Sequence, residues 1–279
     1  MSSDTVRFRN GFDAAAGRRR CMSFRRRILD VSQRVTALHI APAFSCLEMV
    51  DCIYHGLMRR RADGTFQDGF LLSKGHGCMA QFVILEALGI LAPEELDRYC
   101  SPQSRLGGHP DYGTPGIEAA TGSLGHGLSI ALGMAYADTI RGDDRVTYVM
   151  LGDGEMEEGS TWEALMMAPN LGVRNLVGFI DLNDFQGLGR ISDMHPNFYP
   201  IGEKITAFGW EVVEIDGHDA PAVFEAVTAR QGDKPFMLVG RTVKGKGVSY
   251  MENVPIWHYR SPNPDEYRRA IDELCEVSP

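Results

Sequence analysis

The second half of the chain alternates between short apolar runs and segments with helical periodicity. The runs are rich in β-branched and aromatic residues, and they are VTYVML (146–151), NLVGFI (175–180), WEVVEI (210–215) and PFMLVG (235–240). Strands that read as continuous apolar runs and alternate with helices are typical of a parallel sheet that is covered on both faces. The pattern therefore predicts an α/β fold, a parallel sheet with helices on both faces.

The first half of the chain contains several predicted helices. Apolar positions recur at helical spacing in five segments, about 12–38, 44–59, 78–89, 93–100 and 125–141. Residues 101–123 are rich in Gly and Pro and predict a loop, and loops of this length inside compact domains are usually functional. We expect residues 1–10 to be disordered and residues 11–279 to form a single domain.

Composition narrows the class of protein. The chain has 279 residues, of which 44% are hydrophobic, and this is enough for one large α/β domain. No apolar run approaches the roughly 20 residues that cross a membrane, and the net charge of −9 argues against a nucleic-acid partner. Two arginine clusters, 18–20 and 25–27, are interpreted as one solvated face of an N-terminal helix.

The six cysteines are scattered, and no two of them form a C-x-x-C pair. Several lie inside apolar stretches. This distribution indicates reduced, buried thiols in a cytoplasmic protein, and it does not fit a disulfide framework or a zinc site.

The first apolar run ends abruptly at Gly152-Asp153-Gly154. Flanking glycines would let the backbone turn sharply and let a ligand approach closely, while the Asp153 carboxylate points into the crevice beyond the strand. A helix predicted from about Glu157 would present free N–H groups to a diphosphate. Because a diphosphate and a bare carboxylate repel each other, a divalent cation between them is expected.

The second part of this site is predicted after the next apolar run, in FIDLNDFQGLG (179–189). Asn183 offers a side-chain carbonyl oxygen and Phe185 a backbone one, and both are hard ligands of the type that Mg²⁺ prefers. Each loop alone is a weak signal, since a lone GDG is often a turn. Together they predict a metal–diphosphate site with Asp153, Asn183 and Phe185 as ligands of Mg²⁺, for which Ca²⁺ or Mn²⁺ could substitute.

A GDG followed about thirty residues later by Asn resembles the thiamine-diphosphate-binding motif. From about residue 20 to 275 the chain is similar to the amino-terminal half of transketolase, and most similar to the small N-terminal subunit of split, two-chain transketolases. The stretches that carry this resemblance are LHIAPAFSCLEMVD (38–51), GFLLSKGHGCMA (69–80), RLGGHPDYGTPGIEAATGSLGHGLSIALGMA (105–135), LGDGEMEEGSTWEA (151–164), DLNDFQGLG (181–189) and RTVKGKGVSYMENVPIWHYRSPN (241–263).

Four histidines fall at positions where transketolases carry active-site histidines. They are His39, His76, His109 and His258. His76 and His109 lie in glycine-rich loops, where no helix or strand face needs an imidazole, whereas His39 could simply cap the C-terminus of a helix. The resemblance implies that all four are catalytic, line the channel above the thiazolium ring, and bind donor hydroxyls and the diphosphate. Imidazole suits proton transfer because its unperturbed pKa is about 6.5.

The resemblance also implies a set of cofactor-binding residues. This set comprises Gly122, Ser123, Leu124, Gly152, Asp153, Gly154, Glu155, Glu158, Asp181, Asn183 and Lys244, together with His76 and His258. Gly122 and Leu124 would pack near the aminopyrimidine, and Asp181 would steady neighbouring loop groups. Lys244 lies in a KGKG segment near the diphosphate. Glu158 also matches, with Glu163, an acidic position at the family's subunit interface.

In the family, the glutamate that protonates the aminopyrimidine lies in a second, pyrimidine-binding domain, as do the arginines that bind sugar phosphates. The resemblance therefore implies a separate partner chain with the pyrimidine-binding and C-terminal domains, in a two-plus-two tetramer with active sites at the interface. The implied reaction transfers a two-carbon ketol unit from a ketose or ketose phosphate to an aldose.

Other functions remain open on the sequence. Residues 39–43 read His-Ile-Ala-Pro-Ala, where split relatives commonly have His-Ile-Gly-Gly-Ser, and 193–196 is also atypical. These departures leave room for a carboligase that uses a 2-oxoacid donor in specialised metabolism. A non-catalytic binding module and a magnesium-dependent phosphohydrolase that uses Asp153 are further alternatives, although no nucleophile or second metal cluster is evident for the latter.

Overall fold

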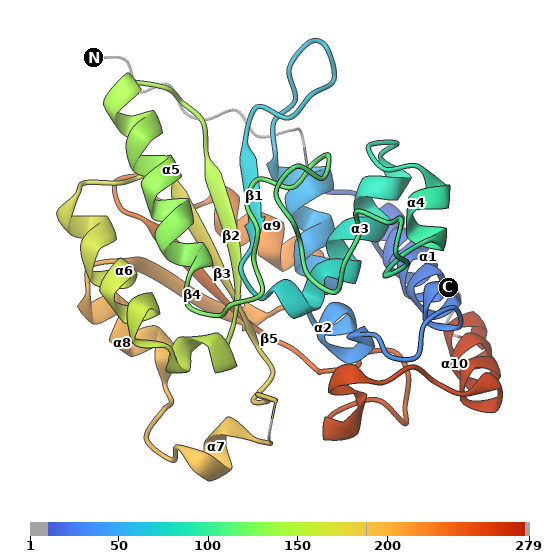
Figure 1. The fold of residues 1–279 in the computed structure, drawn as a ribbon. Helices are drawn as coiled ribbons and strands as arrows, with labels where there is room; N and C mark the ends of the chain where they lie inside the picture. The colour runs from blue at the N-terminus through green and yellow to red at the C-terminus, as the bar shows by residue number, and fades with distance from the viewer. Residues whose placement is uncertain (1–10, 188, 277–279) are drawn as a thin grey trace.

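The computed structural model describes residues 11–187 and 189–276, and it confirms the predicted α/β class (Figure 1). Five parallel strands form one sheet in the order β1-β2-β3-β5-β4. Their bounds are Gly69–Leu72 for β1, Thr147–Gly152 for β2, Leu176–Leu182 for β3, Glu211–Asp216 for β4 and Phe236–Arg241 for β5. Four strands coincide with the predicted runs to within two residues. The fifth, β1, was not predicted.

Helices cover both faces of this sheet (Figure 1). The helices are α1 (Ala14–Ser32), α2 (Ile40–Cys52), α3 (Cys78–Ala87), α4 (Pro93–Asp97), α5 (Gly127–Arg141), α6 (Gly159–Asn170), α7 (Ile191–Met194), α8 (Ile201–Ala207), α9 (Ala220–Thr228) and α10 (Pro264–Glu276). Shorter turns of other helical types are the π-helix η1 (Ile53–Leu57) and the 3₁₀ helices η2 (Gly75–Gly77), η3 (Gly154–Glu157) and η4 (Pro255–Tyr259).

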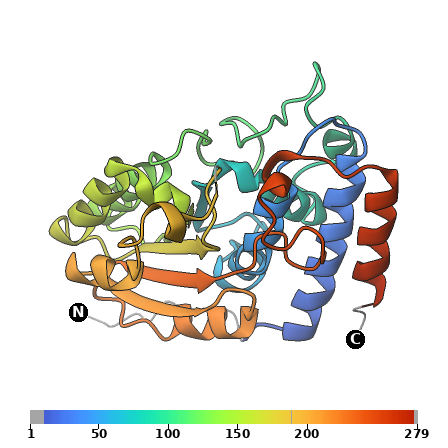
Figure 2. The same cartoon turned by 90° about the horizontal axis from the view of Figure 1, so that it is seen from below.

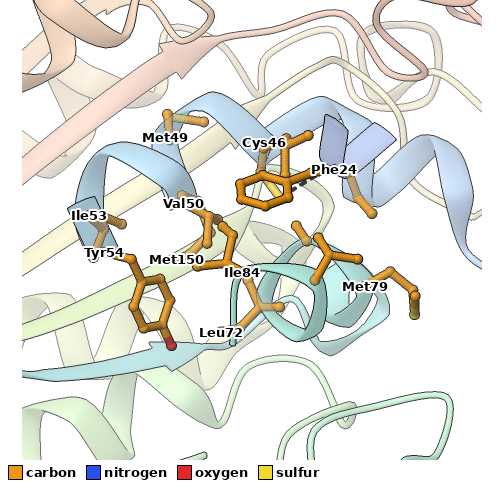
Figure 3. Packing of buried hydrophobic residues seen from close by; sticks show 14 of the residues in the cluster. Phe24, Cys46, Met49, Val50, Ile53, Tyr54, Leu72, Met79, Ile84 and Met150 are labelled. Atoms are coloured by element: carbon orange, nitrogen blue, oxygen red, sulfur yellow. Dashed lines mark hydrogen bonds between the residues drawn. The ribbon is translucent and has the colours of Figure 1, made fainter. Parts of the chain in front are cut away.

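Two apolar clusters result from the alternation of side chains along the strands. Tyr148, Met150 and Phe179 point to one face and pack with residues of α1, α2, α3 and α9. Figure 3 shows part of this cluster, where Met150 and Leu72 lie under residues of α2 and α3. Residues of the opposite face, such as Val149 and Ile180, pack with α5, α6 and α8. Burial on both faces explains why the strands lack polar alternation.

The predicted helix at 12–38 ends at Ser32, and a turn follows it. The next helix begins at Ile40, four residues before the predicted start, so His39 is the N-cap of α2 and not the C-terminal cap considered from the sequence. Pro42 is compatible with this position because the N–H groups of a first turn have no partner within the helix. The helices predicted from 78, 93 and 125 are found within a few residues of the expected bounds.

The interpretation of the arginine clusters as a solvated face was wrong in part. Arg18 and Arg19 are exposed, but Arg25 is only 5% exposed and forms an ion pair with Glu48 at 2.6 Å. Arg20 and Arg27 also form ion pairs, with Asp51 and Glu86 respectively. The reason is the helical period: Arg25 lies on the same face as the buried Ile28 and Leu29, against α2.

Figure 2 shows α10 alongside α1 on the outer side.

Four of the six cysteines are buried as expected, namely Cys21, Cys46, Cys52 and Cys78. The expectation fails for Cys100 and Cys275, which are exposed. None of the described cysteines forms a disulfide. Among the helices of the described residues, none is long and apolar enough to cross a membrane. The expected disorder of residues 1–10 lies outside the described part of the chain.

Candidate functional site

The carboxyl ends of β2 and β3 bring the two predicted metal loops together. Gly152 pairs with Asp181 in the sheet register, so Asp153 and Asn183 leave neighbouring strands at the same edge. The Asp153 side chain accepts hydrogen bonds from the backbone N–H groups of Asn183 and Gly154, both at 2.9 Å. Asp153 is 1% exposed. The predicted ligand Asp153 is therefore anchored within the loop that carries the predicted ligand Asn183.

Electrostatics at this edge favour a cation. Burial, together with the neighbouring carboxylate of Asp181, raises the pKa of Asp153 from 3.8 to about 7. A divalent cation beside Asp153 would offset both effects, since it supplies the missing positive charge. Asp153 and the two oxygens expected from Asn183 and Phe185 form a donor set that fits Mg²⁺ chemically.

The hydrogen bonds of Asn183 define how its amide is turned. Its Nδ2 donates to Ser45 Oγ at 3.1 Å and to Asp181 Oδ2 at 3.2 Å. Its Oδ1 accepts from the backbone N–H of Phe185 at 3.0 Å. Asn183 and Phe185 are both buried, at 8% and 5% exposure. The loop 183–185 is thus folded back on itself beside Asp153.

Two roles were expected of the glycines around Asp153, a sharp turn and room for a ligand, and the structure bears on the first. Neither Gly152 nor Gly154 is in the left-handed region, so the turn does not depend on their backbone freedom. A Cβ on Gly154 would lie 2.8 Å from Cβ of Gln186, and this leaves no room for a side chain between the two metal loops. The predicted helix from Glu157 is also shifted, because a 3₁₀ turn occupies Gly154–Glu157 and α6 begins at Gly159.

The four predicted histidines lie together, although they come from four separate segments. Ring centroids of His39 lie 6.0 Å from His76, 5.6 Å from His109 and 5.4 Å from His258. His76 and His258 are stacked at 5.3 Å. Tyr259 packs on His39 at 4.4 Å. We call these four imidazoles the histidine cluster.

Most of this cluster is neutral near pH 7. Burial, and next the charge of His109, lowers the pKa of His39 to about 4. Burial and Lys244 lower the pKa of His258 to about 3, and burial with Lys74 places the pKa of His76 well below its usual value. Nδ1 of His39 is buried and has no hydrogen-bond partner among the described residues. A neutral imidazole with a free polar atom is suited to bind a hydroxyl or phosphate group of a ligand.

Lys244 connects the histidine cluster to the metal loops. Its Nζ donates to Nδ1 of His258 at 2.9 Å and lies 5.6 Å from the centre of the Phe185 ring. Burial and the nearby Lys74 lower the pKa of Lys244 to about 8. The KGKG segment therefore brings one buried cation to the place where the two parts of the site meet.

The glycine-rich loop before α5 packs against the histidine cluster through Gly122. Gly122 has φ +136°, and a Cβ there would lie 2.8 Å from the His109 ring. A Cβ on Gly75, beside His76, would lie 2.8 Å from the backbone N of Gly122. Leu124 is half-buried and Ser123 is exposed. These contacts place the predicted aminopyrimidine segment beside His76 and His109.

The two glutamates assigned to cofactor binding differ in position. Glu155 is 1% exposed and turned inward, where it accepts hydrogen bonds from Ser73 Oγ and from the backbone of Gly125 at 3.0 Å. Its carboxylate therefore holds three loops together. Glu158 is the exposed N-cap of α6, and Glu163 is exposed on the same helix. Glu158 and Glu163 thus lie on the surface, where another chain could contact them.

Sequence reasoning missed several residues of the site. Lys74 is 1% exposed and forms an ion pair with Asp181, which also accepts hydrogen bonds from Ser45 and Thr242. Tyr199 donates to Asp184 at 3.1 Å and lies 3.5 Å from Asp153. The one signal for Lys74 was its place in SKGH, two residues before His76. A groove of about 1,400 Å³ lies elsewhere, between α1 and the ends of β4 and β5.

The fold and this polar edge define a doubly wound α/β domain whose candidate site lies at the carboxyl ends of central strands. Comparison with known proteins then places the chain. Residues 18–260 match the family "Transketolase, thiamine diphosphate binding domain", and the chain belongs to the transketolase family.

Similar proteins include subunits of two-component enzymes. The chain is 39% identical over 259 residues to a subunit of the apulose-4-phosphate transketolase of Phocaeicola vulgatus, and the match covers 90% of this chain and 91% of that protein. It is 35% identical over 242 residues to the SqwG subunit of the 6-deoxy-6-sulfo-D-fructose transketolase of a Clostridium species, with 85% and 88% covered.

Solved transketolases share the fold over nearly all of this chain. The transketolase from Leishmania mexicana superposes with a TM-score of 0.84 at 26% identity. The match covers 93% of this chain but 41% of that one, so this chain spans less than half the length of the solved enzyme.

Proposed function

We propose that this chain is the diphosphate-binding subunit of a two-component transketolase, which transfers a two-carbon ketol unit together with a partner chain. One observation carries the proposal: Asp153, Asn183 and Phe185 meet at the edge of the sheet from which Lys244 reaches the histidine cluster. When bound, thiamine diphosphate supplies the nucleophilic carbon that takes up and releases the two-carbon unit.

In this proposal Asp153, Asn183 and Phe185 hold Mg²⁺, or Ca²⁺ or Mn²⁺ in its place. Oδ2 of Asp153 already accepts from the backbone N–H groups of Asn183 and Asp184, whereas Oδ1 accepts from Gly154 and keeps a lone pair for a cation. The cation would supply the positive charge that Asp153 and a diphosphate both need, since carboxylates and phosphates are the usual ligands of Mg²⁺ in proteins. Lys244 would add a positive charge on the side of His258.

The histidine cluster would bind the sugar and move protons. Because Lys244 donates to Nδ1 of His258, the ring proton of neutral His258 lies on Nε2, which can donate to a ligand. The buried Nδ1 of His39, which has no partner in the described part of the chain, can accept from a hydroxyl or donate to it, depending on its tautomer. The imidazoles of His76 and His109 lie beside that of His39 and would contact the same ligand. A neutral imidazole has one protonated and one unprotonated ring nitrogen, so it can both donate a hydrogen bond to a hydroxyl group and accept a proton from one.

A partner chain is part of the proposal. The similar proteins of P. vulgatus and Clostridium are named as subunits, and the matches cover about nine-tenths of each. By this analogy the partner supplies the pyrimidine-binding and C-terminal domains in a two-plus-two tetramer. Exposed Glu158 and Glu163 on α6 are candidates for contacts between copies.

The donor would be a ketose, and the names of the two relatives contain sugars with a phosphate or sulfonate group. The alternative of a 2-oxoacid carboligase rested on Ala41, Pro42 and Ala43. All three are buried in the first turn of α2, where their side chains pack inside the protein. We therefore do not favour that alternative. For the alternative of a magnesium-dependent phosphohydrolase that uses Asp153, the described residues contain no cluster of three or more His, Cys, Asp or Glu side chains suited to a metal.

The experiment that tests this proposal is native mass spectrometry of the assembly. The tagged chain is isolated from its own cells in the presence of Mg²⁺ and thiamine diphosphate. The proposal predicts a mass that contains a second, different chain and bound cofactor. A cofactor-free oligomer of this chain alone would contradict it.

A further inference from the structure

Lys74 is a buried cation that the proposed mechanism does not use directly. It follows β1 and precedes the turn that carries His76. Its Nζ donates to the carbonyl oxygen of Pro42 at 3.0 Å and to the carboxylate of Asp181. Its side chain packs along Gly77 and Gly152, where an added Cβ would lie 3.2 Å and 3.7 Å from its carbons. Lys74 is therefore fixed along its whole length between three segments of the site.

The carboxylate of Asp181 accepts hydrogen bonds from four side chains. One carboxylate oxygen accepts from Ser45 at 2.8 Å and from Thr242. The other accepts from Lys74 and, at 3.2 Å, from Nδ2 of Asn183. Asp181 is fully buried. The ammonium group of Lys74 is its only ion-pair partner among the described residues.

This geometry determines the direction of the Asn183 amide. An ionised carboxylate can accept hydrogen bonds but cannot donate them, so the NH₂ group of Asn183 must face Asp181. The carbonyl oxygen Oδ1 then necessarily points the other way, toward the N–H of Phe185. If the amide were reversed, its oxygen would face a carboxylate oxygen and its NH₂ would face both a backbone donor and the cation site.

We propose that Lys74 is a positioning residue for the metal site, which acts through Asp181 to keep the carbonyl oxygen of Asn183 turned toward the cation. This inference rests on the proposed function. Lys74 balances the charge of Asp181, so that a second carboxylate can remain buried beside Asp153 as an acceptor of hydrogen bonds. Through Pro42, the same ammonium group fixes the first turn of α2, whose N-cap is His39.

The test is a Mn²⁺ titration of the assembled complex, followed by the electron paramagnetic resonance signal of free Mn²⁺ at saturating thiamine diphosphate. Lys74→Met removes the charge and keeps the length of the side chain. We expect it to raise the Kd for Mn²⁺ about 10- to 100-fold, the effect typical of residues that orient metal ligands. The matched control is Lys246→Met in the KGKG segment, whose side chain is 43% exposed; its Kd should equal that of the wild type.

The double variant Lys74→Met/Asp181→Asn separates positioning from stability. It removes both buried charges, and the oxygen of the new amide can still accept from Asn183. We expect its Kd to return to within about threefold of the wild type, a coupling that independent sites would not show. Thermal unfolding without metal is measured in parallel. If Lys74→Met does not assemble, the double variant still carries the test.

An unchanged Kd in Lys74→Met would overturn the positioning role. So would a double variant that binds Mn²⁺ at least tenfold more weakly than the wild type. A wild-type complex that binds neither Mn²⁺ nor thiamine diphosphate would instead overturn the proposed function, and the two failures are thus distinguishable.

Discussion

Two buried ionic clusters contact helix α2, and they differ in how their charges are balanced. In one, Glu48 accepts from Arg25 at 2.6 Å and from Nδ1 of His218 at 2.9 Å, while the backbone N–H of Val243 donates to the other ring nitrogen of His218. Burial alone would raise the pKa of Glu48, but Arg25 and His218 lower it to about 2. This cluster is complete without a ligand.

In the other cluster, Lys74 faces two carboxylates, those of Asp181 and Asp153. Burial alone would lower the pKa of Lys74, but the charge of Asp181 outweighs it and raises that pKa. Among the described residues no Lys or Arg forms an ion pair with Asp153, and its pKa is raised to about 7. The comparison shows that charge balance, and not burial itself, distinguishes a structural ion pair from a candidate metal site.

The largest expected effect is the loss of cofactor binding in Asp153→Asn. The variant keeps the size of the side chain but removes the charge that the cation needs, so Mg²⁺-dependent binding of thiamine diphosphate should become undetectable by calorimetry of the complex. Asp143→Asn is the matched control, because that carboxylate is 53% exposed, and it should bind as the wild type does. Unchanged affinity in Asp153→Asn would show that the metal lies elsewhere.

The second effect is on stability without metal. The folded-state pKa of Asp153 is raised, so its protonated form is favoured in the folded protein. The stabilisation that protonated Asp153 gives to the folded protein is fully present below pH 3.8, and it is lost as the pH rises to about 7. The loss amounts to at most about 4 kcal/mol, since one pKa unit is about 1.4 kcal/mol.

Urea unfolding between pH 4 and pH 8 checks this effect. Wild-type stability in EDTA should fall over that window relative to Asp153→Asn, and Mg²⁺ with thiamine diphosphate should abolish this fall in the wild type. Parallel pH profiles for the two proteins would show that Asp153 is already compensated within the chain.

The third prediction concerns the balanced cluster. Glu48→Gln leaves Arg25 buried without its counter-charge and should lower the free energy of unfolding by about 3 kcal/mol. Metal affinity should not change, because Glu48 contacts none of the proposed ligands. Urea unfolding and the Mn²⁺ titration measure the two quantities on the same sample. A large rise in the Kd for Mn²⁺ would show that the two clusters are coupled through α2.

The features that the sequence predicted well depend on local pattern. The four long strands are continuous apolar runs, and the two metal loops follow directly from where the first two of these runs end. The histidine cluster was expected from the resemblance, although His39 lies at the start of a helix and not at the end of one. Strand β1 was missed because four residues, GFLL, are too few to show a period.

The features that the sequence could not predict depend on contacts between distant segments. Lys74 meets Asp181 across 107 positions, and Arg25 meets Lys246 across 221. Nothing in a local run of arginines shows which one turns inward against α2. Similarly, Gly154 is required by the approach of Gln186, a neighbour in space that the loop sequence alone does not specify.

The most direct test of the account is an anomalous difference map from crystals of the assembled complex with Mn²⁺ and thiamine diphosphate. We predict a single metal peak per copy of this chain, bound by the carboxylate of Asp153, Oδ1 of Asn183 and the carbonyl oxygen of Phe185. A peak bound by other residues of this chain, or none beside Asp153 when the cofactor is present, would contradict the account.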